Sequence, residues 1–274
     1  MHPISANALS GALSVTTPLL VHNITETHKR NNNGLRIFKS FNMPKVDWVD
    51  PLVAGAVTGT KISTSKMLGP KIHKRLSNTV LGNRFLISGI TGTIADASVS
   101  TLLYPVFAAK SKLLHEPEYA TNWITTMAKM AATNPTECFQ GIGKHMLVAL
   151  PHTFVRAGAY SCLESFLLDK LVADRKNISN AERIVIAAVA AVGASVAATL
   201  ITKPLATCIE AQGYVHQEVG LRIPFLNVLI EYLKYMILQP MSTIREILPF
   251  LEKNGFFAFI QGGLYEAALI ATGN

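Results

Sequence analysis

The chain has 274 residues, of which 49% are hydrophobic and only 15% are charged, and its formal net charge is +8. Soluble domains usually carry about 25% charged residues, so the composition argues against an ordinary soluble domain and favours a membrane protein. A positive chain can bind nucleic acid, anionic lipid or anionic solutes. None of the common nucleic-acid-binding motifs is present, so we predict no nucleic-acid partner.

Apolar stretches along the chain predict six membrane helices. The clearest is 184–202, nineteen residues without a charge, which is long enough to cross a hydrocarbon core of about 30 Å. Ionisable residues inside such spans usually face a bundle interior or a wet cavity. Asp96, Arg156 and Glu164 fall inside the predicted spans, so the helices are expected to line a polar interior. In chain order the six segments cover 6–24, 51–68, 85–109, 146–168, 184–202 and 256–272.

The second segment contains Gly55 and Gly59 with three residues between them. A phosphate-binding loop needs four residues between its glycines and a lysine directly after the second. Here Thr60 separates Gly59 from Lys61. The spacing therefore indicates a helix-packing face of the Gly-x-x-x-Gly kind.

Two further helices are expected outside the six segments. Residues 244–257 predict a short amphipathic helix that ends in a turn, after which Gly262 opens the sixth segment. Gly141 is expected to open the fourth segment in the same way. An additional amphipathic helix is expected at 223–239.

Prolines recur near the ends of helices that are rich in small residues. Pro18, Pro105 and Pro204 follow one another at intervals of 87 and 99 residues. A membrane helix tolerates a proline where neighbouring groups bond the freed carbonyl, and it kinks there. The spacing predicts three repeats, at 1–78, 79–172 and 173–274, the last with a shortened final helix.

This pattern resembles the mitochondrial carrier family, and the resemblance covers nearly the whole chain. It implies an all-α membrane protein with six transmembrane helices in three pseudo-symmetric repeats. It also implies a monomer, in contact with membrane lipid, that exchanges a small anionic solute by alternating access. The implied location is the mitochondrial inner membrane, with the mitochondrial outer membrane as the alternative.

The charged motifs of that family are only partly present. Each family proline heads a Pro-x-acid-x-x-base motif that forms a gate, but the acidic positions here hold Leu20, Phe107 and Ala206. Of the basic positions only Lys110 keeps its charge. The gate and structural positions that the resemblance implies are Pro18, Pro105, Lys110, Pro204, Gly141, Gly262, Tyr160 and Glu164.

The resemblance places the solute about halfway along the even-numbered helices. Arg156 matches a basic position that is frequent in the family and is expected to contact an anion; a structural arginine that caps backbone carbonyls is the open alternative. Asp96 is expected to pair with a nearby base or to pack between helices. The implied substrate-binding residues are Arg156, Thr58, Val148, Ala149, Thr153 and Leu269.

Two functions stay open from the sequence. One is the carrier-like transporter; the other is a degenerate carrier fold that acts as a non-transporting membrane adaptor or insertion factor, which the missing gate carboxylates favour. No Gly-x-Ser-x-Gly or His-Glu-x-x-His motif is present, so we predict that the protein is not an enzyme and has no cofactor. Three widely spaced cysteines predict neither a disulfide framework nor a metal site.

Overall fold

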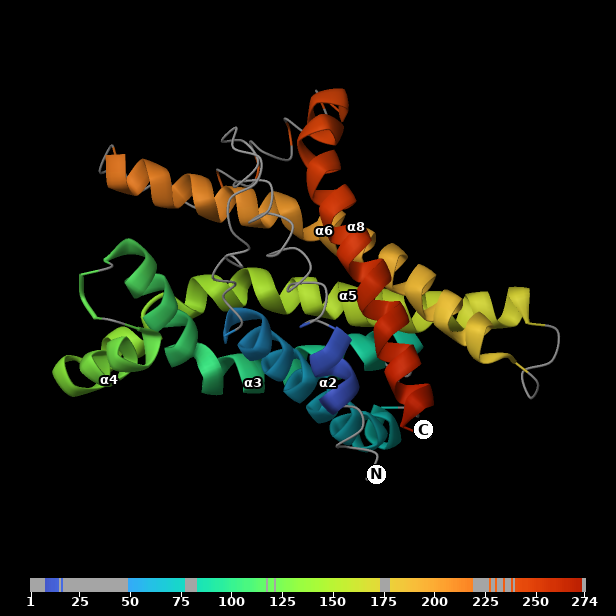
Figure 1. Cartoon of the computed structure of the whole chain (residues 1–274). Helices are drawn as coiled ribbons and strands as arrows, with labels where there is room; N and C mark the ends of the chain where they lie inside the picture. The colour runs from blue at the N-terminus through green and yellow to red at the C-terminus, as the bar shows by residue number, and fades with distance from the viewer. Residues whose placement is uncertain are drawn as a thin grey trace, which may run out of the picture.

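Every regular element in the described part of the chain is helical, which confirms the predicted all-α fold (Figure 1). The computed structural model describes residues 8–14, 16, 49–76, 83–116, 118–120, 122–172, 178–218 and 240–272, and the single residues Asn227, Ile230, Lys234 and Leu238. Residues 8–14 and Thr16 are helical. The labelled elements are α2 (Val49–Leu76), α3 (Arg84–His115), α4 (Trp123–Thr133), η1 (Pro135–Phe139), α5 (Ile142–Leu171), α6 (Asn180–Glu218) and α8 (Pro240–Ala271).

The long helices pack in chain order. Helix α2 contacts α3, α3 contacts α5, α5 contacts α6, and α6 contacts α8. The short elements α4 and η1 pack against α3, and Figure 1 shows them at the end of the molecule where α3 ends and α5 begins. Helix α4 thus lies between the third and fourth predicted segments of the chain.

Local sequence fixes where several helices begin. The side chain of Asn122 accepts a hydrogen bond from the Thr125 amide, and the Thr125 hydroxyl accepts one from the Asn122 amide, which closes a capping box at the start of α4. Ser179 and Glu182 exchange equivalent bonds at the start of α6. Capping of this kind satisfies amide groups that have no partner inside the helix.

Glycines mark the places where helices approach each other most closely. A β-carbon on Gly55 would lie 2.7 Å from the Ala12 carbonyl oxygen, and one on Gly59 would clash with the Ala8 carbonyl. The predicted Gly-x-x-x-Gly packing face is therefore confirmed, and it packs against the helical residues 8–14 and Thr16. Close backbone approach through small residues is typical of membrane helix pairs.

Two helical stretches within the described residues are long and apolar enough to cross a membrane. They are Arg84–Leu113 and Asn180–Thr207, and a shorter apolar stretch covers Gly255–Ala271. Buried helices of soluble proteins can have the same length and apolarity. Large apolar side chains also stand on the surface; Leu102 on α3 is 78% exposed.

The prediction for residues 244–257 was wrong. Helix α8 runs without interruption from Pro240 to Ala271, so there is no turn at Gly255, and Gly262 lies inside the helix instead of opening it. The physical reason is packing: a β-carbon on Gly262 would lie 2.7 Å from the Ala187 carbonyl oxygen of α6. The glycine serves a close helix contact, and tertiary contacts override the local signal for a turn.

Of the predicted helix at 223–239, the structure describes only the four single residues given above, each in helical conformation and exposed. The remainder of that segment lies outside the described residues, as does Pro18. The three-repeat division of the chain stays a prediction.

Candidate functional site

Asp96 of α3 is the buried centre of a polar cluster that joins three helices. It is only 3% exposed, and it forms an ion pair with Lys61 of α2. It also accepts hydrogen bonds from the Ser100 hydroxyl at 3.0 Å and from the Thr153 hydroxyl of α5 at 2.7 Å. A buried carboxylate is stable only when it is paired and hydrogen-bonded. Lys61, Asp96, Ser100 and Thr153 are called the Asp96 cluster below.

The prediction that Asp96 pairs with a nearby base is confirmed, and the base is Lys61. The sequence contained no signal that selected Lys61 among the basic residues. Packing of α2 against α3 makes the choice. Thr153, a predicted substrate-binding residue, belongs to the same cluster through its bond to Asp96.

Arg156 lies three residues after Thr153 on α5, and residues at this spacing share one helix face. Its side chain is partly buried, and one terminal nitrogen donates a hydrogen bond of 2.6 Å to the Gln261 side-chain oxygen of α8. Gln261 is neutral. Within the described residues, Arg156 forms no ion pair with a carboxylate. Among the residues that the structure describes, the positive charge between α5 and α8 therefore has no acidic partner.

The remaining predicted binding residues have less polar surroundings. Thr58 lies one helical turn before Lys61 on α2, and it is partly buried. Val148, Ala149 and Leu269 are also partly buried. The structure thus brings Thr153 and Arg156 to polar groups of neighbouring helices, and it gives the three apolar residues no polar contact.

Sequence reasoning missed Gln261 as a partner of Arg156. The two residues are 105 positions apart, and no local pattern connects them. One signal was available: Gln261 is the only polar side chain between Gly255 and Gly262. A lone amide in an apolar helix needs a hydrogen-bond partner when it is buried.

The predicted gate and structural residues that the structure describes make separate contacts. Lys110 of α3 lies 6.0 Å from the Trp123 ring of α4. Tyr160 donates a hydrogen bond of 3.3 Å to Glu164 within α5. Gly141 caps α5 with a φ of 87°, in the left-handed region that favours glycine, as its predicted helix-opening position requires.

Two of the predicted prolines lie inside long helices. Pro105 falls within α3, which continues to His115, and Pro204 falls within α6, which continues to Glu218. Both helices therefore extend well past the prolines that were expected near their ends.

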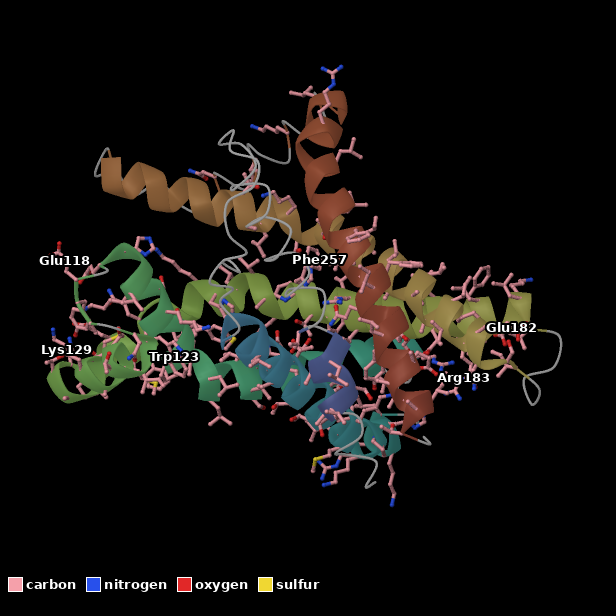
Figure 2. The ribbon with its side chains drawn as sticks, in the orientation of Figure 1. Glu118, Trp123, Lys129, Glu182, Arg183 and Phe257 are labelled. Atoms are coloured by element: carbon pink, nitrogen blue, oxygen red, sulfur yellow. The ribbon has the colours of Figure 1, made fainter. Side chains whose placement is uncertain are left out.

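Further polar bonds join the long helices at the end of the molecule that lies away from α4. Arg183 of α6 forms an ion pair of 2.6 Å with Glu266 of α8. Arg84 of α3 donates hydrogen bonds to Ser161 and Ser165 of α5, at 3.1 and 2.6 Å. Figure 2 shows Arg183 at the end of the molecule away from Lys129 and Trp123 of α4.

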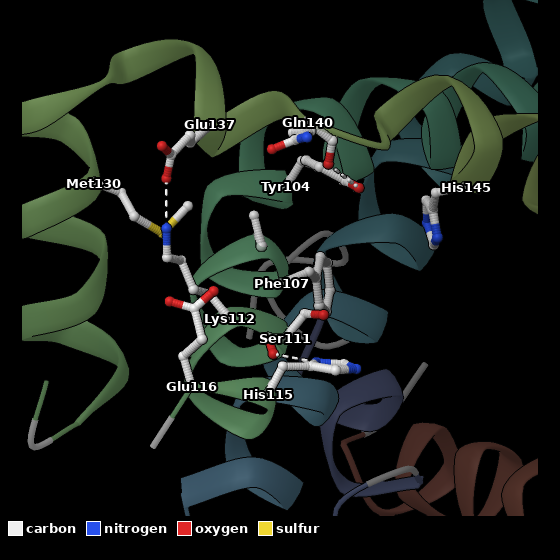
Figure 3. Close-up of a pocket in the computed structure, with 11 residues that line it drawn as sticks. Tyr104, Phe107, Ser111, Lys112, His115, Glu116, Met130, Glu137, Gln140 and His145 are labelled. Atoms are coloured by element: carbon white, nitrogen blue, oxygen red, sulfur yellow. Dashed lines mark hydrogen bonds and ion pairs between the residues drawn. The ribbon is translucent and has the colours of Figure 1, made fainter. Parts of the chain in front are cut away.

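A cavity of about 460 Å³ lies at the junction of α3, η1, α4 and α5 (Figure 3). Lys112 and Glu137 form an ion pair of 2.7 Å across it. The Tyr104 hydroxyl donates a hydrogen bond of 3.0 Å to the Gln140 carbonyl. The lining residues are Tyr104, Phe107, Ala108, Ser111, Lys112, His115, Glu116, Met130, Glu137, Gln140 and His145. The sequence did not predict this cavity, because its walls come from separate elements.

The Lys112–Glu137 ion pair predicts a pH response at this junction. The hydrogen bond from Lys112 lowers the pKa of Glu137 from its ordinary value of 4.5. Because the pKa of Glu137 is lower in the folded state, its ionised, paired form contributes stability to this junction at neutral pH. That contribution is lost as the pH falls below 4.5 and through the folded-state pKa. Cys138 follows Glu137 and is buried, so loosening of this junction should expose its thiol. We therefore expect Cys138 to react with a disulfide reagent at pH 3.5 faster than the rate calculated from the reagent's own pH dependence.

The measurement uses a Cys162→Ser, Cys208→Ser background, which leaves Cys138 as the only one of the three cysteines. Glu137→Gln is the matched control, since it cannot ionise and should show no such acid-dependent step. An identical pH profile in both proteins would contradict the prediction.

Among the described residues, no group of three or more histidine, cysteine, aspartate or glutamate side chains is arranged to hold a metal ion. No protein-family model, curated protein or solved structure matches the chain. The resemblance to mitochondrial carriers therefore rests on the spacing of prolines, glycines and apolar segments in the sequence.

Proposed function

We propose that the protein is a multi-pass membrane protein of the mitochondrial carrier type that exchanges a small anionic solute across the mitochondrial inner membrane. The observation that supports this best is Arg156. It is the fifteenth of the thirty residues of α5, and its hydrogen-bond partner is the neutral Gln261. A cation placed midway along a membrane helix is costly, and such groups usually mark a solute path.

The charges around Arg156 favour an anion. Lys61 and Asp96 balance each other, so among the described residues at this level of α5 the charge of Arg156 is not balanced by a carboxylate. His152 interacts electrostatically with both Arg156 and Asp96, which places the two charges in one neighbourhood. An anionic solute would provide the counter-charge that the described residues do not.

The membrane setting is part of the proposal. Two long apolar stretches, exposed apolar side chains and glycine-mediated helix contacts support it. The six proposed spans are the predicted segment 6–24, α2, α3, α5, α6 and α8, with α4 as a surface helix. Their neighbour contacts follow chain order, as expected for a bundle of helical hairpins.

Reconstitution into liposomes tests the proposal. We expect wild-type protein to exchange at least one labelled anion from a panel of nucleotides, phosphate and carboxylates, with saturation. Arg156→Ala should lower that exchange at least tenfold, because the solute loses its charged partner; tenfold corresponds to about 1.4 kcal/mol. Uptake of each label against the corresponding unlabelled solute is the measurement.

Arg75→Ala is the matched control, since Arg75 is exposed in the last turn of α2 and should leave exchange unchanged. Equal loss in both variants would point to a general charge effect. Absence of uptake of every probe by folded wild-type protein would contradict the transport proposal.

The second candidate is a non-transporting adaptor or insertion factor with a degenerate carrier fold. Phe107 favours it: this residue occupies a position where the family has a gate carboxylate, and its ring stacks near His145, with centroids 6.4 Å apart. An aromatic contact cannot form the ion pair that opens and closes such a gate. Folded protein without transport would favour this candidate.

A further inference from the structure

We propose that Asp96 determines how many negative charges the solute carries, by cancelling the charge of Lys61 and restricting the site to a solute with one net negative charge. The inference rests on the transport proposed above and concerns the same site. It depends on the number of charges between α2, α3, α5 and α8, and on which of them a solute can reach.

The charge count is simple. At the level of Thr153 and Arg156 on α5, Lys61 and Arg156 are the cations and Asp96 is the carboxylate. Glu164 lies about two helical turns further along α5, and Glu266 of α8 forms its ion pair with Arg183. Thr153 donates to Asp96 and lies one helical turn from Arg156. The carboxylate and the guanidinium therefore lie at neighbouring levels of α5. Because two cations and one carboxylate leave one positive charge, a solute with one negative charge makes the site neutral.

Exposure separates the two members of the ion pair. The Lys61 side chain is 30% exposed, whereas that of Asp96 is 5% exposed. An incoming anion can thus contact the lysine while Asp96 stays covered by Ser100 and Thr153. The ammonium group has three donors, so it can bind a solute oxygen without releasing Asp96. In this arrangement Asp96 is a fixed negative charge inside the protein, and it would repel a second negative charge on the solute.

An alternative is that the Asp96 cluster only fastens α2 to α3 and α5. A fastening role predicts that its variants lose stability and that the order of preferred solutes stays the same. A charge-setting role predicts a change in that order. The two roles therefore differ in a readout other than total activity.

Asp96→Asn keeps the shape of the side chain and leaves two cations without a carboxylate. In liposomes we expect wild-type protein to prefer probes with one negative charge, such as pyruvate, over probes with two, such as succinate. In Asp96→Asn the ratio of dianion to monoanion uptake should rise at least tenfold. The double variant Lys61→Gln, Asp96→Asn restores one net positive charge, and it should return the ratio to that of the wild type.

Each outcome decides a different point. Either of two results would overturn the role of Asp96 and leave the proposed transport intact. One is wild-type uptake confined to probes with two or more negative charges; the other is transport by Asp96→Asn with an unchanged order of preferred solutes. No uptake of any probe by folded wild-type protein would overturn the transport itself. If Asp96→Asn does not fold, Lys61→Gln, with no net charge, should lose uptake that the double variant regains. Failure of that recovery would also overturn the inference.

Discussion

Replacement of Gln261 by glutamate is expected to lower anion uptake at least tenfold while the helices stay folded. The glutamate has nearly the same size, and it places a carboxylate oxygen where the Gln261 amide oxygen now accepts the 2.6 Å bond from Arg156. The arginine would then hold an internal counter-ion. Hydrogen bonds to charged groups contribute about 1.5–3 kcal/mol, so a solute that must displace this carboxylate loses at least a factor of ten.

Liposome uptake measures the effect, and circular dichroism in detergent verifies the fold. Gln140→Glu is the matched control, because Gln140 also precedes a glycine but is exposed at the start of α5. It should transport like the wild type. Undiminished uptake by Gln261→Glu would show that the solute does not use Arg156.

Alanine at two adjacent glycines of α8 is expected to change stability in opposite directions. A β-carbon on Gly262 would lie 2.7 Å from both the Ala187 carbonyl oxygen and the Ala191 β-carbon, so Gly262→Ala must push α8 away from α6. Overpacking of this kind costs about 1–3 kcal/mol. A β-carbon on Gly263 meets its nearest neighbour at 3.6 Å, an ordinary contact, and alanine favours a helix by about 1 kcal/mol.

Thermal unfolding in detergent compares the two variants with the wild type. Each is the control for the other, because the chemical change and the helix are the same. We expect Gly262→Ala to unfold at a lower temperature than the wild type and Gly263→Ala at a higher one. A rise in both would mean that α6 and α8 are not in close contact at Gly262.

The sequence predicted helices where the physical signal was local. The uncharged run 184–202 lies inside α6, and 85–109 lies inside α3. Gly55 and Gly59 predicted their own role because a Gly-x-x-x-Gly spacing has one direct structural meaning, a close helix contact. The same reasoning failed at Gly255, where local turn signals had no effect on a helix held by packing against α6.

The candidate site was less accessible to prediction because its contacts join distant segments. Asp96 was expected to have a partner, but only the packing of α2 against α3 selects Lys61. The Arg156–Gln261 bond spans 105 residues, and the Lys112–Glu137 pair spans 25. No periodic pattern encodes such pairs, so their identification required the arrangement of helices in space.

The length of α6 has a mechanical consequence. Its 39 residues give a rod of about 58 Å at about 1.5 Å per residue, whereas a hydrocarbon core is about 30 Å thick. A typical tilt of about 20° takes up only a few ångströms of that difference. In the proposed membrane setting, a large part of α6 therefore projects beyond the hydrocarbon core as a stiff helical arm.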